Sequence, residues 1–266
     1  MLTFLKGIRK YVSHGHRVKH MRMTLSLFLV VLACATSYAQ DRPRALRVVY
    51  LVGGFAHDYD KMPEELAREL KASLERKGRT AEVEITTDLA AFDRASLART
   101  DLLLMNTCQQ SEVSPERREA FLAAVREGLP IVALHCTFWS FQAWPEFRQV
   151  LGAFVPGHAP FGPMCVQLTS DAGNLAADLP ARFELTDEPY YVNERDPAMK
   201  VIAKSCDVYT DGDGKRRDGV ETSVWTKSFG KGRVFAMTFG HDMQSQGSDA
   251  FKRLFNNGVQ WALRMD

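Results

Sequence analysis

The chain has 266 residues, of which 45% are apolar and 25% charged, with 18 glycines and 11 prolines. This balance excludes collagen-like, low-complexity and wholly disordered proteins. The formal net charge of +2 is unevenly distributed, because residues 1–39 contain six basic residues and no acidic one. The other 28 basic residues face 32 acidic ones, which gives residues 40–266 a net charge of −4. Nucleic acid is therefore not an expected partner, since proteins that bind it normally carry a basic face.

The first 39 residues have the layout of a secretory signal peptide. Basic residues precede an apolar run at residues 25–33, whose nine residues fall short of the roughly 20 needed to cross a bilayer. Ser37 and Ala39 are small residues at positions −3 and −1 of a cut after Ala39. We therefore expect an exported protein, in the periplasm or outside the cell, whose mature chain starts near Gln40.

One of the five cysteines, Cys34, lies in this leader. Residues 31–34 loosely resemble a lipobox, in which Cys34 would carry a lipid. A membrane is thus an expected partner only through the leader or this anchor. Cleavage would leave Cys108, Cys136, Cys165 and Cys206, which allow three pairings that their spacing does not distinguish. No Cys-x-x-Cys spacing is present, which excludes a zinc knuckle and a thioredoxin-like motif.

Strands and helices alternate in the first half of the body. Buried strands are expected at residues 45–52, 81–86, 101–106 and 131–134. Leu66, Leu70 and Leu74 recur at helical spacing, which predicts a helix after the first strand. Ser114 as N-cap and Pro115 at the first helical position predict another helix. This alternation indicates βαβ units and a mainly parallel sheet.

The second half of the body consists of short strands joined by polar loops. The strands are expected at residues 165–169, 200–204, 223–228 and 233–238. Residues 211–214 are interpreted as a turn, since they resemble the start of a calcium loop but lack its closing Glu. Ser248 is expected to cap a last helix, whose apolar stripe begins at Phe251. No repeat or linker is evident, so residues 40–266 are expected to form a single domain.

Four histidines lie in this body, and three of them follow predicted strands. His57 follows the first strand, His135 the fourth and His241 the last. Because ligands of open parallel sheets bind at the carboxyl ends of the strands, these side chains are expected to converge on one rim, where they would bury little apolar surface. His158, in a later loop, could fold over that rim. The alternative is that each histidine caps a strand or bonds to the backbone.

Carboxylates accompany the histidines. They are Asp58 beside His57, Asp242 beside His241, and the adjacent Asp187 and Glu188. Imidazole and carboxylate together support general acid–base catalysis near neutral pH. They are also ligands that zinc and similar divalent metals prefer. Three of these acids, Asp58, Asp187 and Asp242, are expected to orient the imidazoles.

Five motifs in chain order resemble the ThuA-like (trehalose-utilisation) family. They are Gly-Gly-Phe-Ala-His-Asp at 53–58, Ala-Leu-His at 133–135, Leu-Gly…Gly-His at 151–158, Leu-Thr-Asp-Glu-Pro-Tyr at 185–190, and Gly-Lys-Gly-Arg-Val-Phe…Phe-Gly-His-Asp at 230–242. The resemblance covers roughly residues 46–264. It implies a class I glutamine amidotransferase-like, flavodoxin-like α/β fold: a mainly parallel sheet flanked by helices, with extra antiparallel strands in the C-terminal half. It also implies a link to the use of trehalose and related sugars.

This kinship raises the question of glutamine hydrolysis, because amidotransferases of this fold carry a nucleophilic Cys at the turn after the strand that corresponds to residues 131–134. Here His135 occupies that elbow and Cys136 follows it, with no downstream His-x-Glu, so glutamine hydrolysis is not expected. The chain also lacks Gly-x-Ser-x-Gly and, after the first strand, Gly-x-Gly-x-x-Gly. Neither a serine hydrolase nor a nucleotide cofactor is therefore expected. The third and fourth strands of this fold are neighbours, which would bring Cys108 close to Cys136.

These observations favour an enzyme that acts on a carbohydrate, either a trehalose-like disaccharide or an oxidised sugar. The expected catalytic residues are His135, His241, Glu188 and Asp242, the expected substrate-binding residues are Trp139, Tyr190 and Asp187, and the expected metal ligands are His57, His135, His158 and His241. The expected cofactor is a divalent metal, with zinc as the first candidate. Trp144 and Trp225 are expected in the core instead. The competing interpretation is a non-catalytic sugar-binding or interaction module, which would hold sugars without turnover.

Overall fold

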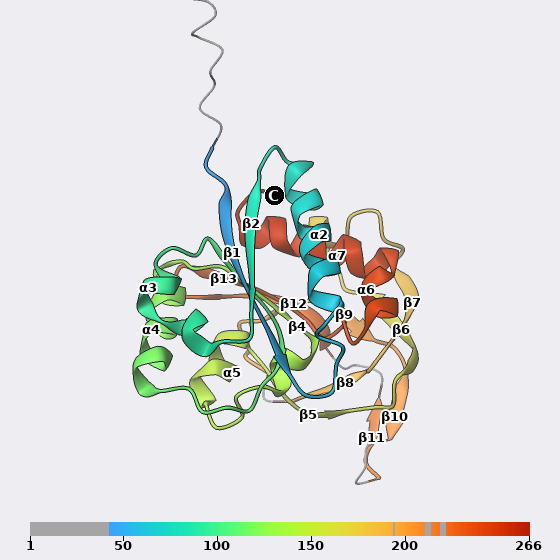
Figure 1. The fold of residues 1–266 in the computed structure, drawn as a ribbon. Coiled ribbons are helices and arrows are strands. Elements are labelled where there is room, and N and C mark those ends of the chain that lie inside the picture. Colours follow the sequence, from blue (N-terminus) through green and yellow to red (C-terminus); the bar gives the residue numbers. More distant parts are fainter. Residues whose placement is uncertain (1–42, 194, 211–213, 219–221) are drawn as a thin grey trace, which may run out of the picture. The chain divides into compact units, whose positions relative to one another are not determined.

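The computed structural model describes residues 43–193, 195–210, 214–218 and 222–266 (Figure 1). The expected leader, with Cys34, lies outside these residues, as does most of the expected turn at 211–214. In the described ranges, no helix combines the length and the apolar character that a membrane span requires.

A nine-stranded sheet has the strand order β2-β1-β3-β4-β13-β12-β9-β6-β7. Five neighbouring strands are parallel: β2 (Ala81–Thr86), β1 (Leu46–Gly54), β3 (Leu102–Cys108), β4 (Ile131–Leu134) and β13 (Gly232–Met237). Four antiparallel strands extend it: β12 (Thr222–Phe229), β9 (Lys200–Ser205), β6 (Gly162–Leu168) and β7 (Arg182–Asp187). The predicted parallel core with an antiparallel extension in the C-terminal half is confirmed.

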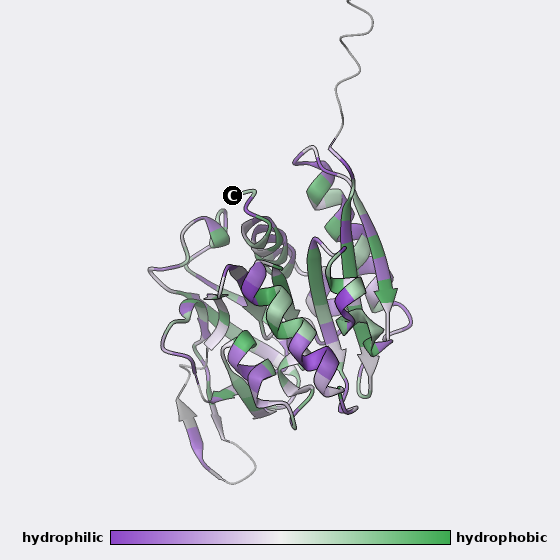
Figure 2. Cartoon of the chain, turned by 90° about the vertical axis from the view of Figure 1, so that its left-hand side faces the viewer, coloured by the Kyte–Doolittle hydropathy of each residue, from purple (hydrophilic) through white to green (hydrophobic). Residues whose placement is uncertain are grey.

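Helices cover both faces of this sheet (Figure 1). One face carries α2 (Met62–Glu75) and α7 (Asp249–Ala262), and the other carries α3 (Arg94–Leu97), α4 (Pro115–Glu127) and α5 (Pro145–Leu151). As predicted, Ser114 caps α4 and Ser248 caps α7, each accepting a backbone N–H from the first turn. Figure 2 shows apolar strands inside and hydrophilic residues on the outer helix surfaces. The central strands are continuous apolar runs because both of their faces are covered.

The sequence did not predict several short elements. The pair β5 (Phe154–His158) and β8 (Tyr190–Asn193) is antiparallel, as is the hairpin of β10 (Val208–Thr210) and β11 (Arg216–Asp218). Three 3₁₀ helices, η1 (Leu89–Phe92), η2 (His135–Trp139) and η3 (Gly173–Ala176), and the short α6 (Met243–Gly247) complete the described elements. Of these, β5, β8 and η2 supply His158, Tyr190 and His135 to the carboxyl-end side of the parallel strands.

Two disulfides join the four cysteines of the body. Cys108 at the end of β3 pairs with Cys136 in η2, and Cys165 in β6 pairs with Cys206, with Cα separations of 5.0 Å and 5.2 Å. These separations are usual for disulfides. The first pair follows from the neighbouring ends of β3 and β4. Gly54 allows the end of β1 to lie close to Cys108 at the end of β3, since a Cβ there would overlap the carbonyl of Cys108.

Gly258 in α7 packs against Phe235 of β13, and we expect its replacement by alanine to destabilise the protein. The added Cβ would overlap the Phe235 ring. Overpacking should cost about 1–3 kcal/mol and outweigh the roughly 0.5–1 kcal/mol gained from helix propensity. Gly247→Ala in α6 is the matched control, because nothing lies within 4 Å of its added Cβ. Urea unfolding compares the two variants, and equal stability would show that Phe235 moves aside at no cost.

Candidate functional site

Three histidines from separate strand ends meet at the carboxyl side of the sheet. His57 follows β1, His135 follows β4 and His241 follows β13. The ring centroid of His57 lies 4.9 Å from that of His135 and 4.8 Å from that of His241, and the last two are 5.4 Å apart. One ring nitrogen from each histidine lies within 4.8 Å of the other two. The convergence expected from the strand order is present in the structure.

His135 is fully buried, rather than exposed at a rim as expected from its position after a strand. Its φ of 46° lies in the left-handed region, which non-glycine residues seldom adopt. Its Nδ1 lies 2.8 Å from the carbonyl of Thr238, which can only accept, so Nδ1 carries the proton. Nε2 is left facing the hydroxyl of Tyr190 at 3.2 Å and Oε2 of Glu188 at 3.4 Å.

Glu188 links the histidines through its carboxylate. Besides His135, Oε2 lies 3.3 Å from Nδ1 of His241, and Oε1 lies 3.7 Å from Nδ1 of His158. Burial alone would raise the pKa of Glu188, but the adjacent His135 and His241 outweigh it and lower this pKa. Burial likewise opposes protonation of His241, yet Glu188 raises its pKa. The lowered pKa of Glu188 and the raised pKa of His241 both favour an ion pair between the two side chains.

His57 is held in its neutral form by its surroundings. Burial first, and the adjacent His135 and His241 next, lower its pKa to about 3. Its buried Nδ1 has no hydrogen-bond partner among the described residues. A neutral imidazole with an unpartnered nitrogen is the form that binds metal ions.

Asp187 connects the segments that carry Glu188, Gly240 and Ser245. It is fully buried and accepts the backbone N–H of Glu188 at 2.7 Å, that of Gly240 at 2.8 Å and the hydroxyl of Ser245. Its Oδ1 is 3.5 Å from Nδ1 of His135. Burial, the dominant influence, raises its pKa. Asp187 was expected to bind substrate as well as to orient an imidazole, but it offers no surface to a substrate and its contacts are those of a positioning residue.

Two other predicted acids make local turn and cap contacts. Asp242 is the N-cap of α6 and accepts the N–H of Ser245 at 2.8 Å. Asp58 accepts the N–H of Asp60 at 3.2 Å. Neither borders the cavity described below, and within the described residues Asp242 acts on the site only through its charge, which is one of the smaller contributions to the raised pKa of His241.

His158 stands apart from the other three histidines. Its side chain is 44% exposed, and its Nδ1 lies 3.0 Å from the carbonyl of Ala159. Its ring stacks on that of Tyr190 at a centroid distance of 5.5 Å. The pairing of β5 with β8 thus places His158 beyond Tyr190, and it does not join the close three-histidine group in which it was expected as a metal ligand.

A cavity of about 360 Å³ opens over these groups. His57, Glu188 and His241 are among the polar residues that border it, and Trp139 and Tyr190 also lie in its wall. Trp139 and Tyr190 thus lie where substrate contact was expected, whereas Trp144 and Trp225 are fully buried core residues, as expected.

The sequence did not point to two exposed aromatic residues near the site, one in the cavity wall and one beside His241. Phe55 borders the cavity and is 57% exposed, and Phe161 is 40% exposed with its ring centroid 4.8 Å from that of His241. Phe55 lies inside the motif at residues 53–58, and its position two residues before His57 was the available signal. Phe161 lies between predicted elements, and the sequence offered no signal for its role.

The trehalose-utilisation family model, ThuA, matches residues 47–262. The chain belongs to the ThuA family. Two solved structures described as ThuA-like proteins share its fold. The one from Parabacteroides merdae is 18% identical, with a TM-score of 0.66 over 84% of this chain and 91% of that chain. The one from Bacteroides uniformis is 19% identical, with a TM-score of 0.67 over 85% and 95%.

A similarity to amidotransferase-type proteins is also present at the level of the fold. A Thermoplasma acidophilum protein described as part of a GMP synthase is 12% identical, with a TM-score of 0.50 over 84% of this ThuA-family chain and 96% of that chain. No match was found among curated proteins. At the strand–helix elbow the ThuA-family chain carries His135, and the sulfur of Cys136 is engaged in the disulfide. In this oxidised form Cys136 is not a free nucleophile.

Proposed function

We propose that this ThuA-family protein is an enzyme that acts on a carbohydrate, a trehalose-like disaccharide or an oxidised sugar, with the aid of a divalent metal. The observation that carries the proposal is the meeting of three imidazoles and Glu188 beside a cavity, which His57, His241 and Glu188 line together with aromatic side chains. A volume of about 360 Å³ is within the usual range of small-molecule sites.

The residues present fit a zinc-like ion. Nδ1 of His135 donates to the carbonyl of Thr238, so Nε2 is the nitrogen that faces the site, 3.4 Å from a carboxylate oxygen of Glu188. A cation bound there would also satisfy the unpartnered Nδ1 of His57. His57, His135 and His241 would hold the ion, with Thr238 fixing the tautomer of His135 as backbone carbonyls do for metal-binding histidines. When bound, such an ion lowers the pKa of water and polarises carbonyl oxygens.

The protein's own groups supply proton transfer and substrate contact. Glu188, held ionised by its histidine neighbours, accepts a proton at its carboxylate, and the half-exposed His158 at 3.7 Å offers an exchange route to solvent. Trp139 and the exposed Phe55 present flat surfaces on which the C–H faces of a sugar ring can pack.

Glu188→Gln tests this assignment. We expect the wild-type protein to turn over at least one sugar in a panel of trehalose, related disaccharides and their oxidised derivatives, measured with zinc present. The variant should lower kcat by about 100-fold or more, because it removes the proton acceptor. Glu184→Gln, at an exposed position of the same β7–β8 region, is the matched control and should be fully active.

Two outcomes of the sugar panel would count against the proposal. Measurable affinity for sugars without any turnover would assign the cavity to a non-catalytic sugar-binding module. If the folded, zinc-loaded protein neither binds nor turns over any sugar of the panel, carbohydrate is not its ligand.

We also propose that the protein is exported. The basic region, the nine-residue apolar run and the small residues before Gln40 support this, and so does the presence of two disulfides, which persist in oxidising compartments. Mass spectrometry of the native protein should find a mature chain that starts near Gln40. A full-length product would contradict export by this leader, and a lipid on Cys34 would instead assign the lipoprotein route.

A further inference from the structure

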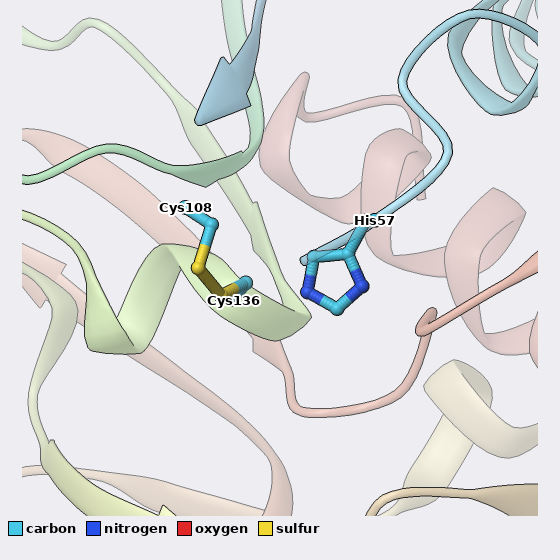
Figure 3. Close-up of side chains that lie close together, drawn as sticks. All are labelled: His57, Cys108 and Cys136. Atoms are coloured by element: carbon cyan, nitrogen blue, oxygen red, sulfur yellow. A yellow bond between two sulfur atoms is a disulfide. The ribbon is translucent and has the colours of Figure 1, made fainter. Parts of the chain in front are cut away.

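The Cys108–Cys136 disulfide lies in the wall of the same cavity, directly beside His57 (Figure 3). Both sulfur atoms and one nitrogen of His57 lie within 4.8 Å of one another. Cys108 and Cys136 are only 1% and 4% exposed, so the three side chains share a sheltered position. Among the described residues, no histidine forms a comparable ligand group with the other disulfide, Cys165–Cys206.

Backbone and side-chain contacts other than the disulfide hold the segments that carry Cys108 and Cys136. Cys108 ends β3, and Cys136 is the second residue of η2, directly after β4. Hydrogen bonds between β3, β4 and β1 hold these strand ends in register. Ser140 adds a link, because its hydroxyl donates to the carbonyl of Thr107 at 2.7 Å and accepts the N–H of Gln109 at 3.1 Å. Opening the sulfur–sulfur bond therefore leaves two thiols beside His57.

We propose that reduction of Cys108–Cys136 creates a second metal site, formed by His57 and the two cysteines. A dithiol reductant gives two electrons and two protons to the sulfurs and becomes a disulfide itself. Metal binding then releases the two thiol protons, because thiolate is the ligand form. Two thiolates and one imidazole are a ligand set for zinc and for soft ions such as Cu(I), and the cavity supplies an open fourth position.

This site goes beyond the proposed function, because it uses a different ligand set and a different redox state. His57 belongs to both sets, together with His135 and His241 in one and with the two cysteines in the other. A single His57 ring cannot serve two ions at once through the same nitrogen. Reduction of the disulfide thus adds a second ligand set, which shares His57 with the first.

Cobalt(II) tests the proposal, because only thiolate ligation gives an intense charge-transfer absorption in the near ultraviolet. The Cys165→Ser/Cys206→Ser variant is titrated with cobalt(II) in oxidised form and after reduction by a phosphine. The phosphine becomes a phosphine oxide, with its oxygen and the two thiol protons taken from water. We expect the thiolate absorption in the reduced protein only, and its loss when Cys108 and Cys136 are also replaced by serine.

Two histidine variants of that protein identify the third ligand. His57→Gln should weaken cobalt binding by the thiolates at least about tenfold, as loss of metal-site residues commonly does. His241→Gln, which removes a histidine outside the proposed set, should retain the absorption. Circular dichroism before titration establishes that both variants are folded. Reduced protein that binds cobalt without thiolate absorption, or unchanged affinity in folded His57→Gln, would overturn the proposal.

Alkylation of the reduced wild-type chain provides a readout that does not depend on these variants folding. Zinc should protect Cys108 and Cys136 from an alkylating reagent and leave Cys165 and Cys206 reactive. The same reduced protein without zinc gives the reference rate of alkylation at each cysteine. Equal reactivity of the four cysteines in the presence of zinc would contradict a site at Cys108 and Cys136, whatever the outcome for activity toward sugars.

Discussion

Asp187→Ala is expected to lower the free energy of unfolding by about 2–4 kcal/mol, because it leaves several buried donors without an acceptor. The N–H groups of Gly240 and Glu188 and the hydroxyl of Ser245 all donate to this carboxylate. Its loss also removes the neighbour of His135 that lies 3.5 Å from Nδ1. The variant should therefore lose metal affinity and activity as well as stability.

Urea unfolding measures the stability change, and Asp171→Ala is the matched control. Asp171 lies in an exposed turn, and its replacement should change stability by no more than about 0.5 kcal/mol. A similarly small effect for Asp187→Ala would mean that water replaces the lost acceptor, and that the carboxylate does not hold the site together.

His135→Ala is expected to abolish zinc binding and also to destabilise the fold. The ring is fully buried, and its removal leaves the carbonyl of Thr238 without its 2.8 Å donor, which should cost about 1–3 kcal/mol. Zinc affinity, measured by calorimetry, should fall at least about 100-fold. His158→Ala, at a 44% exposed position, is the control and should keep both stability and zinc affinity.

The two readouts of His135→Ala separate the alternatives for this residue. Loss of stability with zinc affinity retained would make His135 a structural histidine that bonds to the backbone, which is the alternative left open by the sequence. Loss of zinc affinity in a variant that still folds is the result expected of a ligand.

The fold and the meeting of three histidines could be predicted because they depend on strand order and local periodicity. The bounds of β2 and β4 match the predicted ranges, and the N-caps of α4 and α7 are the predicted serines. Once the strands are parallel neighbours, their carboxyl ends must lie together. The convergence of His57, His135 and His241 could therefore be expected on the condition that their strands share one parallel sheet, which the structure shows.

The depth of the site could not be predicted, because it depends on contacts between distant segments. β5 and β8 pair although the residues His158 and Tyr190 are 32 positions apart, and neither strand has a clear alternating pattern. Asp187 is buried because Gly240 and Ser245 donate to it from more than 50 residues away. The same long-range packing covers His135, which the strand pattern alone places at an exposed rim.

The zinc content of the purified protein tests the central claim most directly. Full-length protein prepared without chelators, equilibrated with zinc in oxidised form and then passed through a desalting column, is examined by elemental analysis. We predict about one zinc ion per chain, and its loss in the folded His57→Ala/His241→Ala variant. Zinc absent from the wild-type protein, or equally abundant in the two proteins, would contradict a metal site formed by the converging histidines.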